Sequence, residues 1–132
     1  MASAVAEQEL RLAVVMTGGV SLAIWMGGVA SEIDQVVRSL DLPAGRRTPE
    51  QQAYAELLEL AKLRPRVDVV SGTSAGGVNG ALLAGAVARR RTLDGLRDIW
   101  LKVADFSELL RSPFERDQQS LLKGDQYFTP GL

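Results

Sequence analysis

The chain has 132 residues, 46% of them hydrophobic, and a formal net charge of −1. This length suits at most one modest domain, and the balanced charge provides no basic stripe of the kind that binds nucleic acid. Cysteine and histidine are absent, which excludes disulfides, thiolate nucleophiles and the usual transition-metal ligands, so we expect neither a metal nor another cofactor.

The first part of the chain predicts a strand followed by a long helix. Residues 1–9 are expected to be a loose leader, and residues 10–16 a buried strand that ends at a glycine pair. Apolar residues then recur at three- and four-residue spacing and predict one helix face. This stripe consists of Leu22, Trp25, Met26, Val29, Ile33, Val36, Val37 and Leu40. The pair Gly27-Gly28 inside it indicates either close approach to a neighbouring element or a kink.

Residues 12–31 carry no charge, a length that would suffice to span a membrane. Glycines interrupt the segment, so we interpret it as a buried strand and a buried helix rather than a membrane helix. The residues before it are not a basic cluster, so no signal peptide is expected.

The middle of the chain predicts a capped helix and a second strand. Thr48, Pro49 and Gln51 form a capping-box start, and this helix is expected to run to about Leu63, where Arg64-Pro65 ends it. Residues 66–70 follow as a strand. About 50 residues with a helix separate the two strands, which favours a parallel pair joined by a crossover.

The sequence Gly72-Thr73-Ser74-Ala75-Gly76 follows the second strand and precedes a small-residue helix expected from near Gly76. A serine at such a strand–helix corner is typical of a nucleophile elbow. Glycine at 72 and 76 would avoid collisions between strand and helix, and the Ala75 amide would face a developing oxyanion. The alternative is a structural turn in which Ser74 caps the helix.

A second glycine turn, Thr17-Gly18-Gly19, follows the first strand. Turns after parallel strands emerge at the same edge of the sheet, so the amides of Gly18 and Gly19 are candidates for the remaining oxyanion donors. The alternative is a phosphate-binding or purely structural turn.

The last third of the chain gives weaker signals. Arg89-Arg90-Arg91 is interpreted as a solvated helix end, and Thr92 is expected to cap a further helix that reaches residue 103. Residues 105–132 are mixed, with turns at 112–113 and 129–131. Two strands cannot cover a sheet's edges and faces, so we interpret the chain as the N-terminal piece of a larger domain.

The glycine loop and the segment around Ser74 resemble patatin-like phospholipases, over roughly residues 10–103 and most strongly at 66–84. The resemblance implies an α/β fold, a three-layer α/β/α domain with a mainly parallel sheet, of which residues 10–132 would be the N-terminal portion. It implies a serine acyl hydrolase acting on lipid esters through a serine–aspartate dyad, with Ser74 as nucleophile and Gly18 and Gly19 in the oxyanion hole.

Two features depart from the family pattern. Thr17, Ser21 and Leu22 stand where the family's loop usually carries a glycine, a basic residue and a glycine. The family's aspartate lies in a motif far downstream of the serine, whereas the Asp94-Gly95 of this chain follows Ser74 by about 20 residues and is better explained as a helix-start charge. We therefore expect the dyad aspartate to lie outside this chain, and the chain alone to lack turnover.

The expected partner is a lipid ester substrate, with peripheral membrane contact allowed and nucleic acid excluded. The expected location is the cytoplasm or a membrane surface. The alternative function is a non-catalytic module that holds a phosphate or lipid headgroup at its two glycine-rich helix starts.

Overall fold

A computed structural model of the chain describes residues 7–103 and residue 111. The strands are β1 (Gln8–Met16) and β2 (Leu63–Gly72), and the helices are α1 (Ala23–Ser39), α2 (Pro49–Ala61), α3 (Ala75–Arg89) and α4 (Leu96–Val103). The strands pair in parallel, from Gln8 opposite Leu63 to Met16 opposite Gly72. This confirms the α/β class and the parallel pair.

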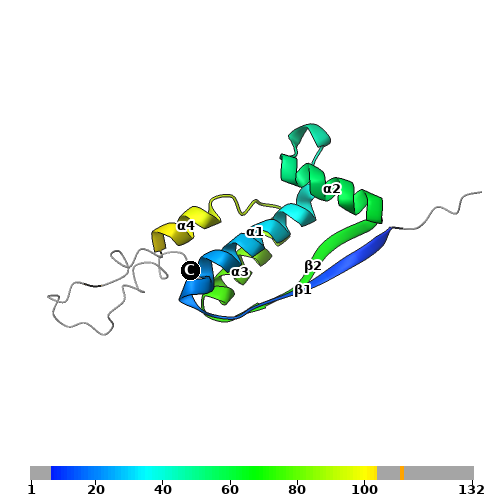
Figure 1. The fold of residues 1–132 in the computed structure, drawn as a ribbon. Helices are drawn as coiled ribbons and strands as arrows, with labels where there is room; N and C mark the ends of the chain where they lie inside the picture. The colour runs from blue at the N-terminus through cyan, green and yellow to red at the C-terminus, as the bar shows by residue number, and fades with distance from the viewer. Residues whose placement is uncertain (1–6, 104–110, 112–132) are drawn as a thin grey trace, which may run out of the picture.

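The described helices lie on one face of the two-stranded sheet (Figure 1). Helix α3 packs on both strands, and α1 packs on α3 and α4. The core between them includes Met16, Met26, Leu83 and Trp100. On the sheet, Val15 is 73% exposed and Val69 is 55% exposed, so no described element covers the other face, and the third layer stays a prediction.

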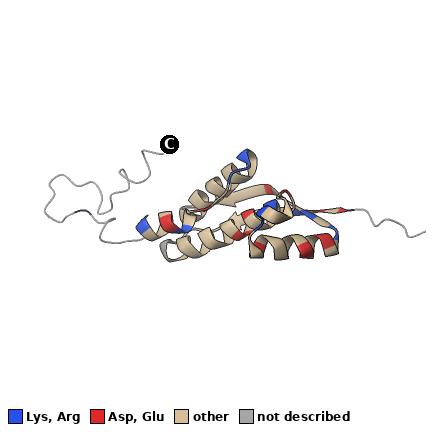
Figure 2. Cartoon of the chain, turned by 90° about the horizontal axis from the view of Figure 1, so that it is seen from above, with Lys and Arg blue, Asp and Glu red and all other residues tan. Residues whose placement is uncertain are grey.

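The amino-terminal halves of the strands carry a network of ion pairs. Arg64 pairs with Glu7 (Nε–Oε2 2.7 Å), and Arg66 pairs with Asp68 (Nε–Oδ1 2.6 Å) and Glu9 (Nη1–Oε1 3.3 Å). Figure 2 shows charged residues along α2 and the adjoining ends of the strands. These pairs are exposed and each contributes little stability.

The hydrogen bonds between β1 and β2 show that β1 begins before residue 10. The Gln8 amide donates to the carbonyl of Lys62 at 2.9 Å, and Glu9 faces Arg64 in the strand register. The expected leader therefore overlaps the strand at residues 8 and 9, while residues 1–6 lie outside the described part of the chain.

Helix α2 begins as predicted and ends earlier. The Thr48 hydroxyl accepts from the Gln51 amide (3.3 Å) while the Gln51 side chain accepts from the Thr48 amide (3.0 Å), which confirms the capping box. Lys62 has a φ of 55° and ends the helix. Because the chain turns there, β2 already begins at Leu63 and contains Pro65, so the prediction that Arg64-Pro65 ends the helix was wrong.

Helix α1 buries only part of the predicted stripe. Its buried residues include Met26 of the stripe together with Ala23, Gly27 and Ala30, and Ile33 of the stripe packs partly buried against the same core. Trp25 is instead 67% exposed. It lines, with Leu12, Gly28, Val29, Glu32, Ile33 and Val36, a groove of about 480 Å³.

The glycine pair in α1 acts through close approach. A Cβ on Gly27 would lie 2.9 Å from Cδ1 of Trp100, whereas a Cβ on Gly28 would meet nothing within 4 Å. Helix α1 continues unbroken through both residues.

A buried amide joins three helices behind the sheet. The Asn79 side chain donates to the carbonyl of Ala23 at 3.0 Å and accepts from Nε1 of Trp100 at 2.6 Å. These bonds tie α3 to α1 and α4, so the position of α3 depends on both neighbours.

Helix α4 starts later than predicted. It begins at Leu96, after Gly95 with a φ of 86°, so Thr92 does not cap it. The Leu93 amide instead donates to Oδ2 of Asp34 at 3.4 Å, which fixes the α3–α4 connection to α1. The turns expected at 112–113 and 129–131 lie outside the described residues.

Candidate active site

The candidate nucleophile occupies a two-residue corner between β2 and α3. Ser74 has φ 53° and ψ −128°, a backbone conformation that is strained for any residue except glycine. The corner is closed by the Gly76 amide, which donates to the carbonyl of Thr73 at 2.9 Å. The Ser74 side chain is exposed and makes no capping hydrogen bond. The alternative in which the Ser74 hydroxyl caps the helix is therefore not seen.

The two glycines that flank the corner are required by close backbone contact. A Cβ on Gly72 would collide with the carbonyl oxygen of Gly76 and lie 2.7 Å from the Gly77 nitrogen. A Cβ on Gly76 would collide with the carbonyl oxygen of Met16 and lie 2.6 Å from that of Thr17. Helix α3 thus begins in direct contact with the ends of both strands, which projects Ser74 from the sheet edge.

The glycine loop after β1 lies against Ser74. A Cβ on Gly18 would be 2.8 Å from the Cβ of Ser74 and 3.6 Å from its Oγ. Gly19 has a φ of 145°, which side-chain-bearing residues rarely adopt. The structure therefore brings the glycine loop after β1 and the Ser74 corner after β2 together, as the sequence predicts.

The three expected oxyanion donors differ in their hydrogen bonding. The Gly18 amide donates to Oγ1 of Thr73 at 3.1 Å. For the amides of Gly19 and Ala75, no hydrogen bond is recorded within residues 7–103. Sequence reasoning had not singled out Thr73. The sequence feature that could have identified Thr73 is its position: it is a polar residue directly before the serine, at the point where β2 ends beside β1.

The described part of this edge carries no formal charge. Residues 12–31 and 69–88, which form the loop, the corner and the starts of α1 and α3, contain no Asp, Glu, Lys or Arg. Within residues 7–103, no side chain is hydrogen-bonded to the Ser74 hydroxyl. The partial positive charge at the start of α3 favours an anion beside Ser74.

Asp94 lies far from this corner. It follows the end of α3 and lies near Asp34: burial raises the pKa of the Asp34 carboxyl, and the negative charge of Asp94 acts in the same direction. The 15 residues of α3, at about 1.5 Å each, separate the two ends by about 22 Å. This placement agrees with the expectation that Asp94 is not a base for Ser74.

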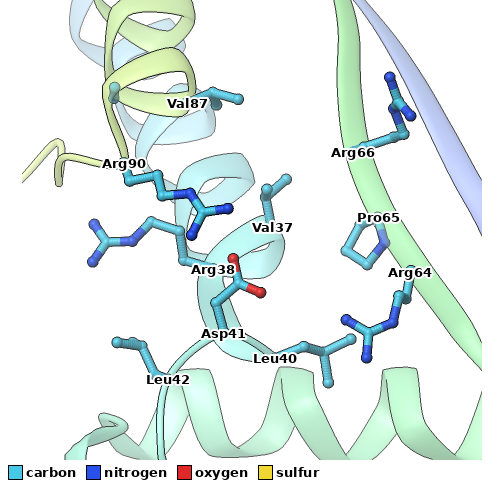
Figure 3. Close-up of a pocket in the computed structure, with 11 residues that line it drawn as sticks. Val37, Arg38, Leu40, Asp41, Leu42, Arg64, Pro65, Arg66, Val87 and Arg90 are labelled. Atoms are coloured by element: carbon cyan, nitrogen blue, oxygen red, sulfur yellow. The ribbon is translucent and has the colours of Figure 1, made fainter.

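A second hollow lies at the opposite end of α1 and α3. It has a volume of about 440 Å³ and is lined by Arg38, Arg64, Arg66 and Arg90 together with Asp41 and apolar residues. Figure 3 shows Arg90 and Asp41 pointing into the space between α1 and β2.

The position of each arginine in this hollow is explained by an ion pair or by a helix end close to it. Arg38 pairs with Asp34 (Nη1–Oδ2 3.5 Å), and Arg64 and Arg66 belong to the strand ion pairs. Arg90 ends α3 with a φ of 52°, and the carboxyl ends of two helices favour cations there. The hollow lies at the opposite end of α3 from Ser74, so it is separate from the serine edge.

Comparison with known proteins gives one family and one curated relative. The family model described as patatin-like phospholipase matches residues 14–130. The chain is 43% identical over 131 residues to an uncharacterized membrane protein of Mycobacterium tuberculosis (Rv3479), an alignment that covers 90% of this chain and 12% of that protein. No solved structure matches the chain. Within the described residues, each helix is too short or too polar to cross a bilayer.

Proposed function

The chain belongs to the patatin-like phospholipase family, and on that premise we propose that the protein carrying it is a serine acyl hydrolase of lipid esters. The chain spans 12% of the length of its curated relative, so the activity is proposed for the full-length protein. The observation that carries the proposal is the Ser74 corner: an exposed, uncapped hydroxyl on a strained backbone with positive φ, with the glycine loop packed against it.

The proposed reaction follows from the groups at this edge. The Oγ of Ser74 attacks the ester carbonyl carbon, and its proton passes to a base. The carbonyl oxygen becomes an oxyanion at the start of α3, where the Ala75 and Gly19 amides donate to it. The tetrahedral intermediate then expels the alcohol, which takes the proton from the base, and water releases the fatty acid by the same steps.

The base is proposed to be an aspartate outside the described residues. The chain contains no histidine, and no carboxylate within residues 7–103 is bonded to Ser74. A carboxylate brought to this edge would complete a two-residue dyad. It follows that residues 7–103 alone should show no turnover beyond the weak catalysis that an oxyanion hole provides.

A fluorophosphonate probe on the full-length protein tests the proposal. We expect labelling of the wild type and of the control Ser71→Ala, an exposed serine three residues earlier on β2, and no labelling of Ser74→Ala. Release of fatty acid from phospholipid vesicles should be lost in the same variant.

Two results would contradict this function. One is labelling that survives Ser74→Ala, and the other is a wild type that neither reacts nor hydrolyses lipid. If that unreactive wild type binds vesicles containing anionic lipid, and Ser74→Ala binds them equally, the glycine-rich helix starts form a headgroup-binding module instead.

A further inference from the structure

We propose that Thr73 is a positioning residue: its hydroxyl holds the Gly18 amide and so leaves the Gly19 and Ala75 amides as the oxyanion donors. This inference rests on the proposed serine hydrolase function.

Thr73 connects the two glycine turns through two hydrogen bonds, one donated by its backbone amide and one accepted by its side chain. Its backbone amide donates to the carbonyl of Met16 at 3.2 Å, one step beyond the last strand pair. Its side-chain Oγ1 accepts from the Gly18 amide at 3.1 Å. The first contact aligns the end of β1 with the corner, and the second fixes the loop two residues further on.

The second contact determines which amides can stabilise an oxyanion. An amide has one hydrogen, and that of Gly18 is directed at Thr73. Gly18 itself lies against Ser74, with no room for a Cβ between them. Gly18 therefore serves as the spacer that sets the loop beside the nucleophile, and the next amide along the loop, that of Gly19, is left to pair with Ala75.

The contact matters for geometry more than for stability. Thr73 is exposed, and an exposed hydrogen bond contributes little net free energy because water competes for both partners. Catalytic donors, in contrast, must be held within about 0.5 Å of the productive position. A loop released by about 1 Å would slow acylation by about 100-fold while the fold stays intact.

The competing explanation is that threonine is present only because a β-branched residue suits the end of a strand. Valine would then serve equally well. Thr73→Val removes the acceptor and keeps the shape, and Thr73→Ser keeps the acceptor and removes the branch, so the pair separates the two explanations.

The experiment measures the rate of fluorophosphonate labelling and the kcat and KM for a soluble ester, using the full-length protein. A fluorophosphonate adduct places an oxygen where the oxyanion forms, so the labelling rate reports the state of the hole. We expect Thr73→Val and Thr73→Ala to label about 10- to 100-fold more slowly with a matching loss in kcat, an unchanged KM and an unchanged melting temperature. Thr73→Ser should react within about threefold of the wild type, a factor below the effect expected from a lost donor.

The outcomes separate this inference from the function on which it rests. A wild type without labelling at Ser74 refutes the function. If the wild type is labelled at Ser74, two results would overturn the inference. One is a folded Thr73→Val or Thr73→Ala variant that reacts at the wild-type rate, and the other is a Thr73→Ser variant whose labelling rate falls as far as that of Thr73→Val. Hydrogen exchange at the Gly18 amide gives a second readout, since it should accelerate in Thr73→Val and stay slow in Thr73→Ser.

Discussion

Substitution of Gly76 by alanine should damage the site through backbone contact alone. The added Cβ would collide with the carbonyl oxygen of Met16 and lie 2.6 Å from that of Thr17, whereas ordinary van der Waals contact begins at 3.4 Å. Both neighbours are backbone atoms, so α3 and the end of β1 must separate by about 0.5–1 Å. Overpacking of this kind costs about 1–3 kcal/mol.

Helix propensity acts in the opposite direction, so a matched variant is needed. Gly28→Ala makes the same chemical change in the interior of α1, where the Cβ would meet nothing within 4 Å. It should stabilise the helix by up to about 1 kcal/mol. The two substitutions are thus expected to have opposite signs.

Hydrogen exchange followed by mass spectrometry measures both effects in the full-length protein. Peptides covering residues 69–88 should exchange about 5- to 150-fold faster in Gly76→Ala, and those covering 20–40 should exchange more slowly in Gly28→Ala. Labelling at Ser74 should fall by about 100-fold in the first variant and stay unchanged in the second. Protection and labelling at wild-type level in Gly76→Ala would refute the contact argument, as would equal damage in Gly28→Ala.

Three further predictions concern the helices. Trp100→Phe removes the donor to the buried Asn79 and should cost about 1–3 kcal/mol in thermal unfolding, whereas the control Trp25→Phe, at an exposed position, should cost nothing measurable. Burial raises the pKa of Asp34, so the folded state binds this proton more readily than the unfolded state does. The free energy of unfolding should therefore fall as pH rises above the usual aspartate range. Asp34→Asn should flatten this dependence on pH in melts between pH 4 and 8, and an unchanged dependence would contradict the prediction. Thr48→Ala breaks the capping box and should lower stability by about 1 kcal/mol, with faster exchange confined to the first turn of α2.

Local signals in the sequence predicted the elements well, because they depend on neighbouring residues. The capping box at Thr48 and the strand–glycine–helix corner at Ser74 both involve contacts within a few positions. The end of α2 was missed because Lys62, in a left-handed conformation, gives a weaker signal than the proline after it. The start of α4 was missed because Thr92 fits a cap locally, while the Leu93 amide is used by Asp34 from another helix.

The buried face of α1 shows a different limit. Periodicity finds an apolar stripe, but it does not say which neighbour each residue meets. Close contact with Trp100 requires a glycine at position 27, whereas Trp25 of the predicted stripe is exposed. The Thr73–Gly18 bond was likewise beyond sequence reasoning, because its partners are 55 positions apart and meet only through the strand register.

The uncharged edge around Ser74 also bears on substrate choice. Residues 12–31 and 69–88 can supply backbone dipoles, hydroxyl groups and apolar surface, but no charged side chain that attracts or repels an ionic headgroup. Long-range attraction of charged ligands weakens as salt is added. If the lipid preference of the full-length protein depends on salt, the responsible charges therefore belong to residues outside these two segments.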